Sequence, residues 1–325
     1  MKTLVLNAQQ QTDIALAAQL LQQGKLVAVP TETVYGLAAD ATNPTAVRAI
    51  FTAKGRPADH PLIVHVHSVD AISDWACDIP QTAWVLAKAF WPGPLTLLLK
   101  KAPRVNAVVT GGLDTIGLRM PAHPALLTLL QQHQLAVAAP SANRYKKLSP
   151  TSCEQVLSGL TGRIDAVLDG GFCQHGVEST IVDLTSERIQ IVRAGPITAS
   201  DLTKVLHAPV YQPEQHQVKV SGNVDAHYQP NTPLKCFTSA KLQQLAETAT
   251  ADVAILHYTA LPSACKALSI AMPGEAAAYA SVLYQRLYQA DNAGAGSIWC
   301  ELPPEGEAWL AVHDRLRRAS FSRRD

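Results

Sequence analysis

A length of 325 residues exceeds what one hydrophobic core usually fills, so two domains are expected. Apolar residues make up 47% and charged residues 16% of the chain, a balance that excludes a largely disordered protein. The formal net charge of +1 excludes a protein-wide field that would attract nucleic acid or a membrane, so any anion site must be a local group of Lys and Arg.

Hydrophobic periodicity predicts an α/β domain over the first two-thirds of the chain. The expected helices span residues 11–23, 46–54, 82–90, 124–133, 153–160 and 201–206. The expected strands span residues 26–29, 62–66, 95–99, 116–120, 135–139, 166–168, 180–184 and 189–192. Several strands follow one another without an intervening helix, which favours a mixed sheet over a purely parallel one.

The rest of the chain predicts a linker and a second domain. Residues 208–233 are polar, contain several prolines and have little periodicity, so they are interpreted as an interdomain linker. After it, strands are expected at 234–237, 253–257 and 297–301, and helices at 242–249, 276–290 and 307–319. The predicted organisation is therefore a catalytic domain at 1–207, a linker or lid at 208–233 and a small α/β domain at 234–325. The last helix carries Arg315, Arg317 and Arg318, for which a solvated face is the expected role.

Two motifs near the N-terminus carry side chains suited to ligand binding. Residues 30–36, Pro-Thr-Glu-Thr-Val-Tyr-Gly, directly follow a buried strand, and strand ends are where α/β sheets bind ligands. Residues 54–57, Lys-Gly-Arg-Pro, end a helix and place Lys54 and Arg56 around a glycine, which suits a polyanion. The alternatives are a proline-led turn and the ordinary capping of a helix end by cations.

Later segments add further polar groups. Residues 138–143 follow an apolar strand and offer Ser141 and Asn143, although an ordinary turn is the alternative. Arg119 lies in an otherwise apolar strand and needs an anionic partner, either a carboxylate of the protein or one of a ligand. His65 and His67 alternate along a strand, but no third ligand is evident, so half-buried histidines are expected instead of a metal site.

The cysteines and the N-terminal residues indicate the cellular compartment in which the protein is expected. None of the six cysteines forms a Cys-x-x-Cys pair, which is typical of thiols in a reducing compartment. The N-terminus has Asp13 and a glutamine run instead of a basic start followed by an apolar stretch, and no apolar run is long enough to span a bilayer. We therefore expect a cytoplasmic protein with no signal peptide and no membrane segment.

Taken in order, the motifs carry a specific resemblance. They are Pro-Thr-Glu-Thr-Val-Tyr-Gly-Leu at 30–37, Lys-Gly-Arg-Pro at 54–57, Pro-Leu-Ile-Val-His at 61–65, Phe-Trp-Pro-Gly-Pro-Leu-Thr at 90–96, Arg-Met-Pro-Ala-His-Pro at 119–124, Ala-Pro-Ser-Ala-Asn at 139–143 and Gly-Val-Glu-Ser-Thr at 176–180. This series closely resembles the threonylcarbamoyl-AMP synthase, or YrdC-like, family over residues 10–206. The linker and tail resemble the longer two-domain members more loosely, because the basic residues expected before His227, Tyr228 and Pro230 are missing.

The resemblance implies a fold and a reaction. The expected fold is a twisted mixed-sheet YrdC-like α/β domain with a second, smaller Rossmann-like α/β domain. The implied enzyme is a nucleotidyltransferase that converts L-threonine, bicarbonate or CO2, and ATP into threonylcarbamoyl-adenylate and pyrophosphate. ATP is the implied nucleotide substrate, and Mg²⁺ is expected to arrive with it. The product supplies threonylcarbamoyladenosine in tRNA, so partner proteins of tRNA modification are expected, together with weak or no direct binding of nucleic acid.

The same resemblance assigns site residues by position. Lys54 and Arg56 are implied to be catalytic and to clamp the triphosphate. The full set implied for ATP is Lys54, Arg56, His60, Thr115, Ser141, Asn143, Ser149, Arg193 and Ser221. The set implied for L-threonine is Thr31, Tyr35, His65, Arg119, Ala139 and Ser179. Two of these positions depart from the family pattern, since His60 replaces a frequent asparagine and Ala139 stands where some members carry threonine.

Two other interpretations stay open. One is a non-catalytic YrdC-like module that holds structured RNA, although the near-zero net charge argues against tight RNA binding. The other is a related carbamoyl-adenylate activity, as in hydrogenase maturation proteins. Those proteins carry acylphosphatase and zinc-finger segments, and this chain has no Cys-x-x-Cys pair.

Overall fold

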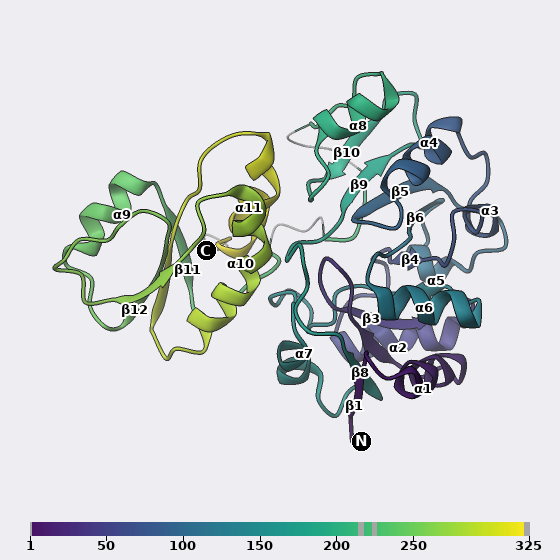
Figure 1. The fold of residues 1–325 in the computed structure, drawn as a ribbon, viewed down its shortest axis with the longest axis horizontal. Coiled ribbons are helices and arrows are strands. Elements are labelled where there is room, and N and C mark those ends of the chain that lie inside the picture. Colours follow the sequence, from purple (N-terminus) through teal and green to yellow (C-terminus); the bar gives the residue numbers. More distant parts are fainter. Residues whose placement is uncertain (1, 214–217, 223–225, 322–325) are drawn as a thin grey trace. The chain divides into compact units, whose positions relative to one another are not determined.

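A computed structural model describes residues 2–213, 218–222 and 226–321 (Figure 1). The chain forms two compact units. The first consists of Met1–Tyr145, Pro150–Gln174 and Glu178–Asn223, and the second of Lys146–Ser149, His175–Val177 and Val224–Asp325. Two short loops from the first two-thirds of the sequence therefore belong with the C-terminal unit. Among the described residues, no helix has the length and apolar character needed to cross a membrane.

The first unit contains a ten-stranded sheet in the order β1-β8-β2-β3-β7-β4-β6-β5-β9-β10. Its strands are β1 Leu4–Asn7, β2 Val27–Val29, β3 Gly36–Asp40, β4 Ile63–His65, β5 Leu95–Lys100, β6 Thr115–Arg119, β7 Val137–Ala138, β8 Ala166–Asp169, β9 Thr180–Asp183 and β10 Gln190–Arg193. Pairs such as β4 with β6 are parallel, whereas β2 with β3 and β5 with β6 are antiparallel. The expected mixed sheet is thus confirmed.

Helices pack on both faces of this sheet (Figure 1). They are α1 Gln11–Gln22, α2 Pro44–Lys54, α3 Ile72–Trp75, α4 Gln81–Phe90, α5 Ala107–Thr110, α6 Pro124–His133, α7 Cys153–Leu160 and α8 Ala199–Leu206. Side chains of α1 and α6 join one apolar cluster, and those of α2, α4 and α7 join another. Along β2, Ala28 belongs to one cluster while Val27 and Val29 belong to the other. This two-sided burial explains why the central strands are apolar throughout instead of alternating.

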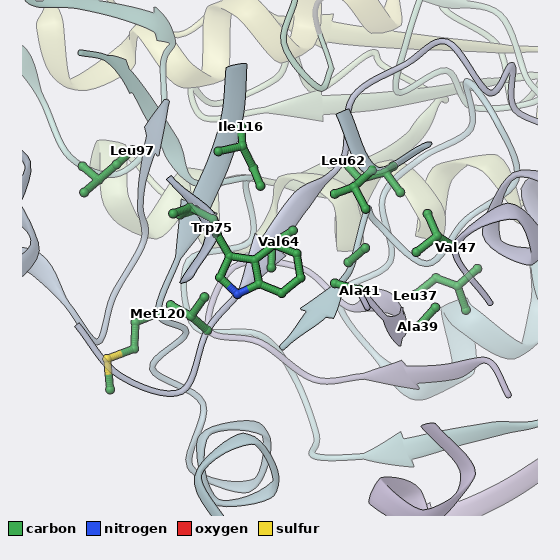
Figure 2. Packing of buried hydrophobic residues seen from close by; sticks show 14 of the residues in the cluster. Leu37, Ala39, Ala41, Val47, Leu62, Val64, Trp75, Leu97, Ile116 and Met120 are labelled. Atoms are coloured by element: carbon green, nitrogen blue, oxygen red, sulfur yellow. The ribbon is translucent and has the colours of Figure 1, made fainter. Parts of the chain in front are cut away.

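The larger cluster lies under the candidate site. Figure 2 shows its packing, in which Leu37, Leu62, Val64, Ile116 and the Trp75 indole come from separate elements and meet in one core. All of these side chains are buried. Strands β3, β4 and β6 contribute to this core and adjoin loops that carry candidate site residues. The core therefore fixes the ends of those loops.

The second unit contains a four-stranded parallel sheet in the order β11-β14-β12-β13. Its strands are β11 Leu234–Phe237, β12 Val253–His257, β13 Leu268–Ala271 and β14 Ser297–Glu301. Its helices are α9 Ser239–Ala246, α10 Ala276–Asp291 and α11 Leu310–Ala319, the last preceded by the 3-10 turn η1 Glu307–Trp309. A small, open and wholly parallel sheet agrees with the expected Rossmann-like domain.

Several short elements were not anticipated from the sequence. β1 lies at the edge of its sheet with Leu4 and Val5 exposed, so it has no buried periodic pattern. β3 contains Gly36 and two alanines, which have low strand propensity, and it forms because both of its neighbours pair with it. β13, α3 and α5 are only four residues long, too short for a periodic signal.

Helix α2 is important because it delivers the basic motif. It starts at Pro44, two residues before the expected Ala46, because the Asn43 side chain accepts hydrogen bonds from the Thr45 and Ala46 amides. It ends at Lys54, and Gly55 follows with a left-handed φ of 64°. A side chain at this glycine position would be strained, so the glycine terminates the helix between the two cations.

Two neighbouring residues of α4 test the packing of the larger apolar cluster. Leu86 is fully buried in the larger cluster, whereas Val85 is 36% exposed. Leu86→Ala should lower the free energy of unfolding by about 2–5 kcal/mol, because the cavity cannot collapse fully. Val85→Ala should change it by less than about 1 kcal/mol. Urea unfolding of the two variants measures the contrast, and equal midpoints would contradict the assigned packing.

Candidate active site

The loop between β2 and β3 is held by its own threonines. The Thr31 hydroxyl donates to the Val34 carbonyl (2.6 Å) and accepts from the Thr33 amide (3.0 Å). It also lies 2.8 Å from the Thr33 hydroxyl. Both threonines are buried. These side-chain to backbone bonds fix the turn that the Pro30–Gly36 motif forms.

A buried ion pair connects this loop to β6. The Arg119 guanidinium lies 2.5 Å from the Glu32 carboxylate, and the two side chains are only 4% and 5% exposed. Arg119 also donates to the Thr33 hydroxyl (2.9 Å) and to the Gly93 carbonyl (3.1 Å), and Glu32 accepts from the Ala122 amide (3.0 Å). The anionic partner expected for Arg119 is therefore a carboxylate of the protein itself.

The Glu32 carboxyl stays ionised in this environment. Burial alone raises its pKa, but the charge of Arg119 and the hydrogen bonds from Arg119 and the Ala122 amide outweigh burial and hold the pKa below its usual value. A charged carboxylate is what the buried arginine requires. Breaking such a pair leaves one buried charge uncompensated, which costs about 3–5 kcal/mol.

His65 lies next to this ion pair. Strand β4 pairs with β6 so that His65 is in register with Arg119. The side chain is 3% exposed, and burial, followed by the charge of Arg119, lowers the pKa of His65 to about 3. The imidazole is therefore neutral near pH 7, so it can offer a hydrogen bond to a ligand but no positive charge.

Ser179, Arg193 and Ser221 form a second group. Arg193 donates to the Ser179 carbonyl and hydroxyl, both at 2.9 Å, and to the Ser221 carbonyl at 3.0 Å. The Ser179 hydroxyl also lies 2.7 Å from the hydroxyl of Thr96 on β5. These contacts join the start of β9, the end of β10 and the described part of the linker at one place.

The linker segment 218–222 also packs on this side of the sheet. Val220 is buried in an apolar cluster with Ile63, Leu98 and Ile181. The hollow that it fills, which Thr115 also lines, retains only about 10 Å³. That space is about one water molecule. Residues 214–217 and 223–225 of the predicted linker and lid lie outside the described residues.

Lys54 forms the centre of a third group. Its side chain is buried, and Nζ donates to the carbonyls of Ser141 (2.5 Å) and Asn143 (2.6 Å). Its own carbonyl accepts from the Tyr145 amide at 2.9 Å. Burial, followed by the charge of Arg56, lowers the pKa of Lys54 well below its usual value. A bound anion would offset both effects and favour the charged ammonium.

Arg56 and His60 lie on the loop that follows α2. Arg56 is half-buried and donates to the Pro61 carbonyl at 3.2 Å. His60 packs edge-on against the Tyr145 ring, with centroids 5.6 Å apart. Because the Tyr145 amide also bonds to the Lys54 carbonyl, the loop after α2 and the loop after β7 are connected.

The loop after β7 also meets the loop after β2. The Leu37 amide donates to the Pro140 carbonyl (2.6 Å), and the Ala142 amide donates to the Tyr35 carbonyl (2.8 Å). A Cβ at Gly36 would lie 3.1 Å from the Cβ of Ala139. Small residues at both positions therefore allow the close approach that brings these two motifs together.

Tyr35 faces the core and not an open surface. Its side chain is fully buried, and its hydroxyl donates to the Gly171 carbonyl (2.8 Å) and accepts from the Gly170 amide (3.0 Å). Burial also raises the pKa of the phenol well above its usual value. The phenol thus supports the loop by anchoring it to the end of β8.

Most residues implied at the site thus fall into linked groups within the first unit. Ser149 differs. It is buried, and it belongs to the segment Lys146–Ser149, which is part of the second unit. Sequence reasoning named the Thr33 hydroxyl only as a ligand-binding group of the Pro30–Gly36 motif, and it assigned no role to Glu32 or Thr96. The available signal for Glu32 was charge, because Arg119 in an otherwise apolar strand needs an anionic partner.

Metal ligands are a separate question. No group of three or more His, Cys, Asp or Glu side chains suited to a metal ion occurs within the part of the chain that the structure describes. His65 and His67 therefore lack a third protein ligand among these residues.

The neutral state of His65 predicts a pH dependence of stability. Its folded pKa of about 3 lies below the unfolded value of about 6.5, so unfolding takes up a proton between them. The stabilisation is complete above pH 6.5 and is lost as the pH falls toward 3. Between pH 6 and 4, wild type should lose up to about 1.4 kcal/mol more per pH unit than His65→Gln. Identical slopes in chemical unfolding would contradict this.

Two family models match the chain. The model described as "Telomere recombination" matches residues 19–195, and the model described as "Threonylcarbamoyl-AMP synthase, C-terminal domain" matches residues 197–320. Together they cover both units.

Individual relatives and solved structures agree with these matches. A threonylcarbamoyl-AMP synthase of Pyrococcus abyssi is 37% identical, covering 98% of each chain, and one of Bacillus subtilis is 37% identical, covering 95% of this chain and 93% of that one. A crystal structure of P. abyssi Sua5 complexed with L-threonine superposes with a TM-score of 0.88 at 36% identity and covers 98% of each chain. Since both family models and near-full-length relatives match, this chain belongs to the threonylcarbamoyl-AMP synthase family, in its longer two-domain form.

Proposed function

We infer that the chain catalyses the reaction of its family, in which L-threonine, bicarbonate or CO2, and ATP give threonylcarbamoyl-adenylate and pyrophosphate. Similarity over 98% of the chain to a protein named as this synthase carries the inference. The site supports it, because a group around Arg119 suits an amino acid and a separate group around Lys54 and Arg56 suits a polyphosphate. The product then serves threonylcarbamoyladenosine formation in tRNA.

For threonine we propose a pocket around Arg119. A guanidinium has five N–H donors, and three contacts engage Arg119 here, so donors remain for a substrate carboxylate. The other proposed contacts are Thr31, His65, Ala139 and Ser179. Tyr35, which was also expected there, acts in this proposal through its anchoring bonds at the end of β8.

For ATP we propose that three cations, Lys54, Arg56 and Arg193, contact the phosphates and that further polar groups complete the site. The set is Lys54, Arg56, Arg193, His60, Thr115, Ser141, Asn143, Ser149 and Ser221. Lys54 supplies a compact charge, and Arg56 supplies a planar fork suited to phosphate oxygens. Phosphate oxygens near Lys54 would raise its pKa toward its usual value, so binding of ATP and protonation of this lysine reinforce each other.

The chemistry requires positioning more than covalent catalysis. The neutral amine of threonine takes up CO2 and loses a proton to form a carbamate, and a carbamate oxygen then attacks the α-phosphorus of ATP in line as pyrophosphate leaves. The carbamate, ATP and the leaving pyrophosphate are all anionic, so Lys54 and Arg56 act by neutralising charge on the phosphates. We propose that Mg²⁺ comes bound to ATP, since the described residues have no suitable cluster of their own.

The division of labour along the chain is also a proposal. Residues 1–207 form the catalytic domain, residues 208–233 the linker and lid, and residues 234–325 the small C-terminal domain. The protein works in the cytoplasm and passes the adenylate to partner proteins of tRNA modification. With a net charge of +1, its own contact with nucleic acid is weak or absent.

Pyrophosphate release tests this function. The purified chain should release pyrophosphate from ATP only when threonine and bicarbonate are both present. Lys54→Ala and Arg56→Ala should each lower kcat/KM at least about 100-fold, because each removes a cation that faces the phosphates. Arg104→Ala is the matched control, since Arg104 is an exposed cation that pairs with Asp74 and is not among the proposed site residues.

Thermal unfolding of each variant separates loss of chemistry from loss of fold. Near-normal turnover in both Lys54→Ala and Arg56→Ala would overturn the site assignment. A wild-type chain that retains structured RNA but releases no pyrophosphate would favour the alternative of a non-catalytic RNA-binding module.

A further inference from the structure

Strand β5 contains one buried hydroxyl in an apolar sequence. Thr96 stands among the leucines at 95 and 97–99, and its side chain is fully buried. A buried hydroxyl is unfavourable unless it forms a hydrogen bond, so the partner of Thr96 indicates what this residue does.

The hydroxyl of Thr96 pairs with the hydroxyl of Ser179, the residue that precedes β9. The two oxygens lie 2.7 Å apart, and Ser179 is 1% exposed. Thr96 has no other side-chain hydrogen bond among the residues that the structure describes. If Ser179 were the donor, the Thr96 proton would be buried without an acceptor. Thr96 therefore donates this hydrogen bond, and Ser179 accepts it.

Ser179 accepts a second hydrogen bond from Arg193. The guanidinium donates to the Ser179 hydroxyl at 2.9 Å, and it cannot act as an acceptor. A hydroxyl has two acceptor positions and one proton. Thr96 and Arg193 fill both acceptor positions, so the proton of Ser179 is given to neither of them. The Ser179 hydroxyl can therefore contact a ligand only as a donor, to an acceptor atom such as a carboxylate oxygen.

The backbone of Ser179 is held by other contacts. Arg193 also donates to the Ser179 carbonyl at 2.9 Å. A Cβ at Gly195 would lie 2.7 Å from the carbonyl carbon of Ser179, so the missing side chain at Gly195 allows a close approach of the two backbones. Loss of the Thr96 hydroxyl therefore frees the Ser179 hydroxyl without releasing the backbone that carries it.

This hydroxyl pair lies beside residues that are proposed to bind threonine. A Cβ at Gly117 would lie 3.3 Å from the methyl carbon of Thr96, so Thr96 packs against β6, the strand that ends at Arg119. Arg193 lies near His65, since its charge contributes to the lowered pKa of that imidazole, after burial and the charge of Arg119. All of these residues belong to the first unit.

We propose that Thr96 is a positioning residue for L-threonine, because its donated hydrogen bond directs the Ser179 proton to an oxygen of the bound amino acid. Thr96 itself is fully buried, so it acts through Ser179. This inference rests on the proposed function, in which Ser179 contacts threonine. It adds the polarity of that contact, in which Ser179 donates and the amino acid accepts.

Two substitutions at Thr96 separate the hydroxyl from the methyl group. Thr96→Val keeps the shape but removes the hydroxyl, so it should raise the KM for threonine at least fivefold. The kcat and the KM for ATP should stay within twofold, because the lost contact binds the amino acid before and during the reaction. Thr96→Ser loses the buried methyl and should unfold at a lower temperature than wild type, but it should keep all three constants within twofold.

Thr185 provides a matched control on the other side of β9. Its hydroxyl donates to the Asp183 carboxylate, also at 2.7 Å, and it is not among the proposed site residues. Thr185→Val should leave the KM for threonine within twofold of wild type. Equal rises in Thr96→Val and Thr185→Val would overturn the proposal. A threonine KM that rises as much in Thr96→Ser as in Thr96→Val would overturn it too, since the effect would then follow packing.

A double-mutant cycle tests whether Thr96 acts through Ser179. Ser179→Ala removes the hydroxyl that Thr96 directs. Thr96→Val should then add no further change in the threonine KM to the Ser179→Ala variant. Independent, multiplicative effects of the two substitutions would contradict the assigned route.

Direct binding of L-threonine keeps this proposal distinct from the proposed function. Calorimetry with wild type, Thr96→Val and Thr96→Ser should show at least fivefold weaker binding in the valine variant alone. A wild-type chain that binds threonine but releases no pyrophosphate overturns the proposed function, and the calorimetric contrast then still decides the role of Thr96. Equal affinities in all three proteins would overturn that role.

Discussion

The buried ion pair between Glu32 and Arg119 is the interaction on which the candidate site depends. It joins the loop after β2 to the end of β6, and its hydrogen bonds extend to Thr33, Gly93 and the Ala122 amide. Because both side chains are buried, removing either one would leave the other as an uncompensated buried charge. The pair therefore holds an arginine in place before any substrate arrives, with donors left over for a carboxylate.

The other cations of the site follow the same principle. Lys54 donates to carbonyls of loop 141–143, and Arg193 donates to carbonyls of Ser179 and Ser221. These charges are placed by oxygen atoms of the protein, so their geometry is set by the backbone of neighbouring loops. A protein with a net charge of +1 can in this way hold positive charge in local groups without a global basic field.

Sequence patterns predicted the mixed sheet, the larger helices and the second parallel domain, because long periodic segments with buried faces dominate those elements. They missed β3, whose glycine and alanines form a strand only through pairing with both neighbours. Arg119 was expected to have an anionic partner, but long-range pairing with Glu32 follows from tertiary structure alone. For the same reason Arg315 was expected on a solvated face, although the fold buries it against Tyr228.

The central claim is that this two-substrate site joins carbon from bicarbonate to threonine and to AMP. Mass spectrometry of the product formed from threonine, ATP and ¹³C-bicarbonate tests it most directly. The account predicts an adenylate that contains threonine and one carbamoyl carbon, heavier by a single ¹³C substitution, and absent when threonine is omitted. An adenylate that lacks the label, or no adenylate in the complete mixture, would contradict the account.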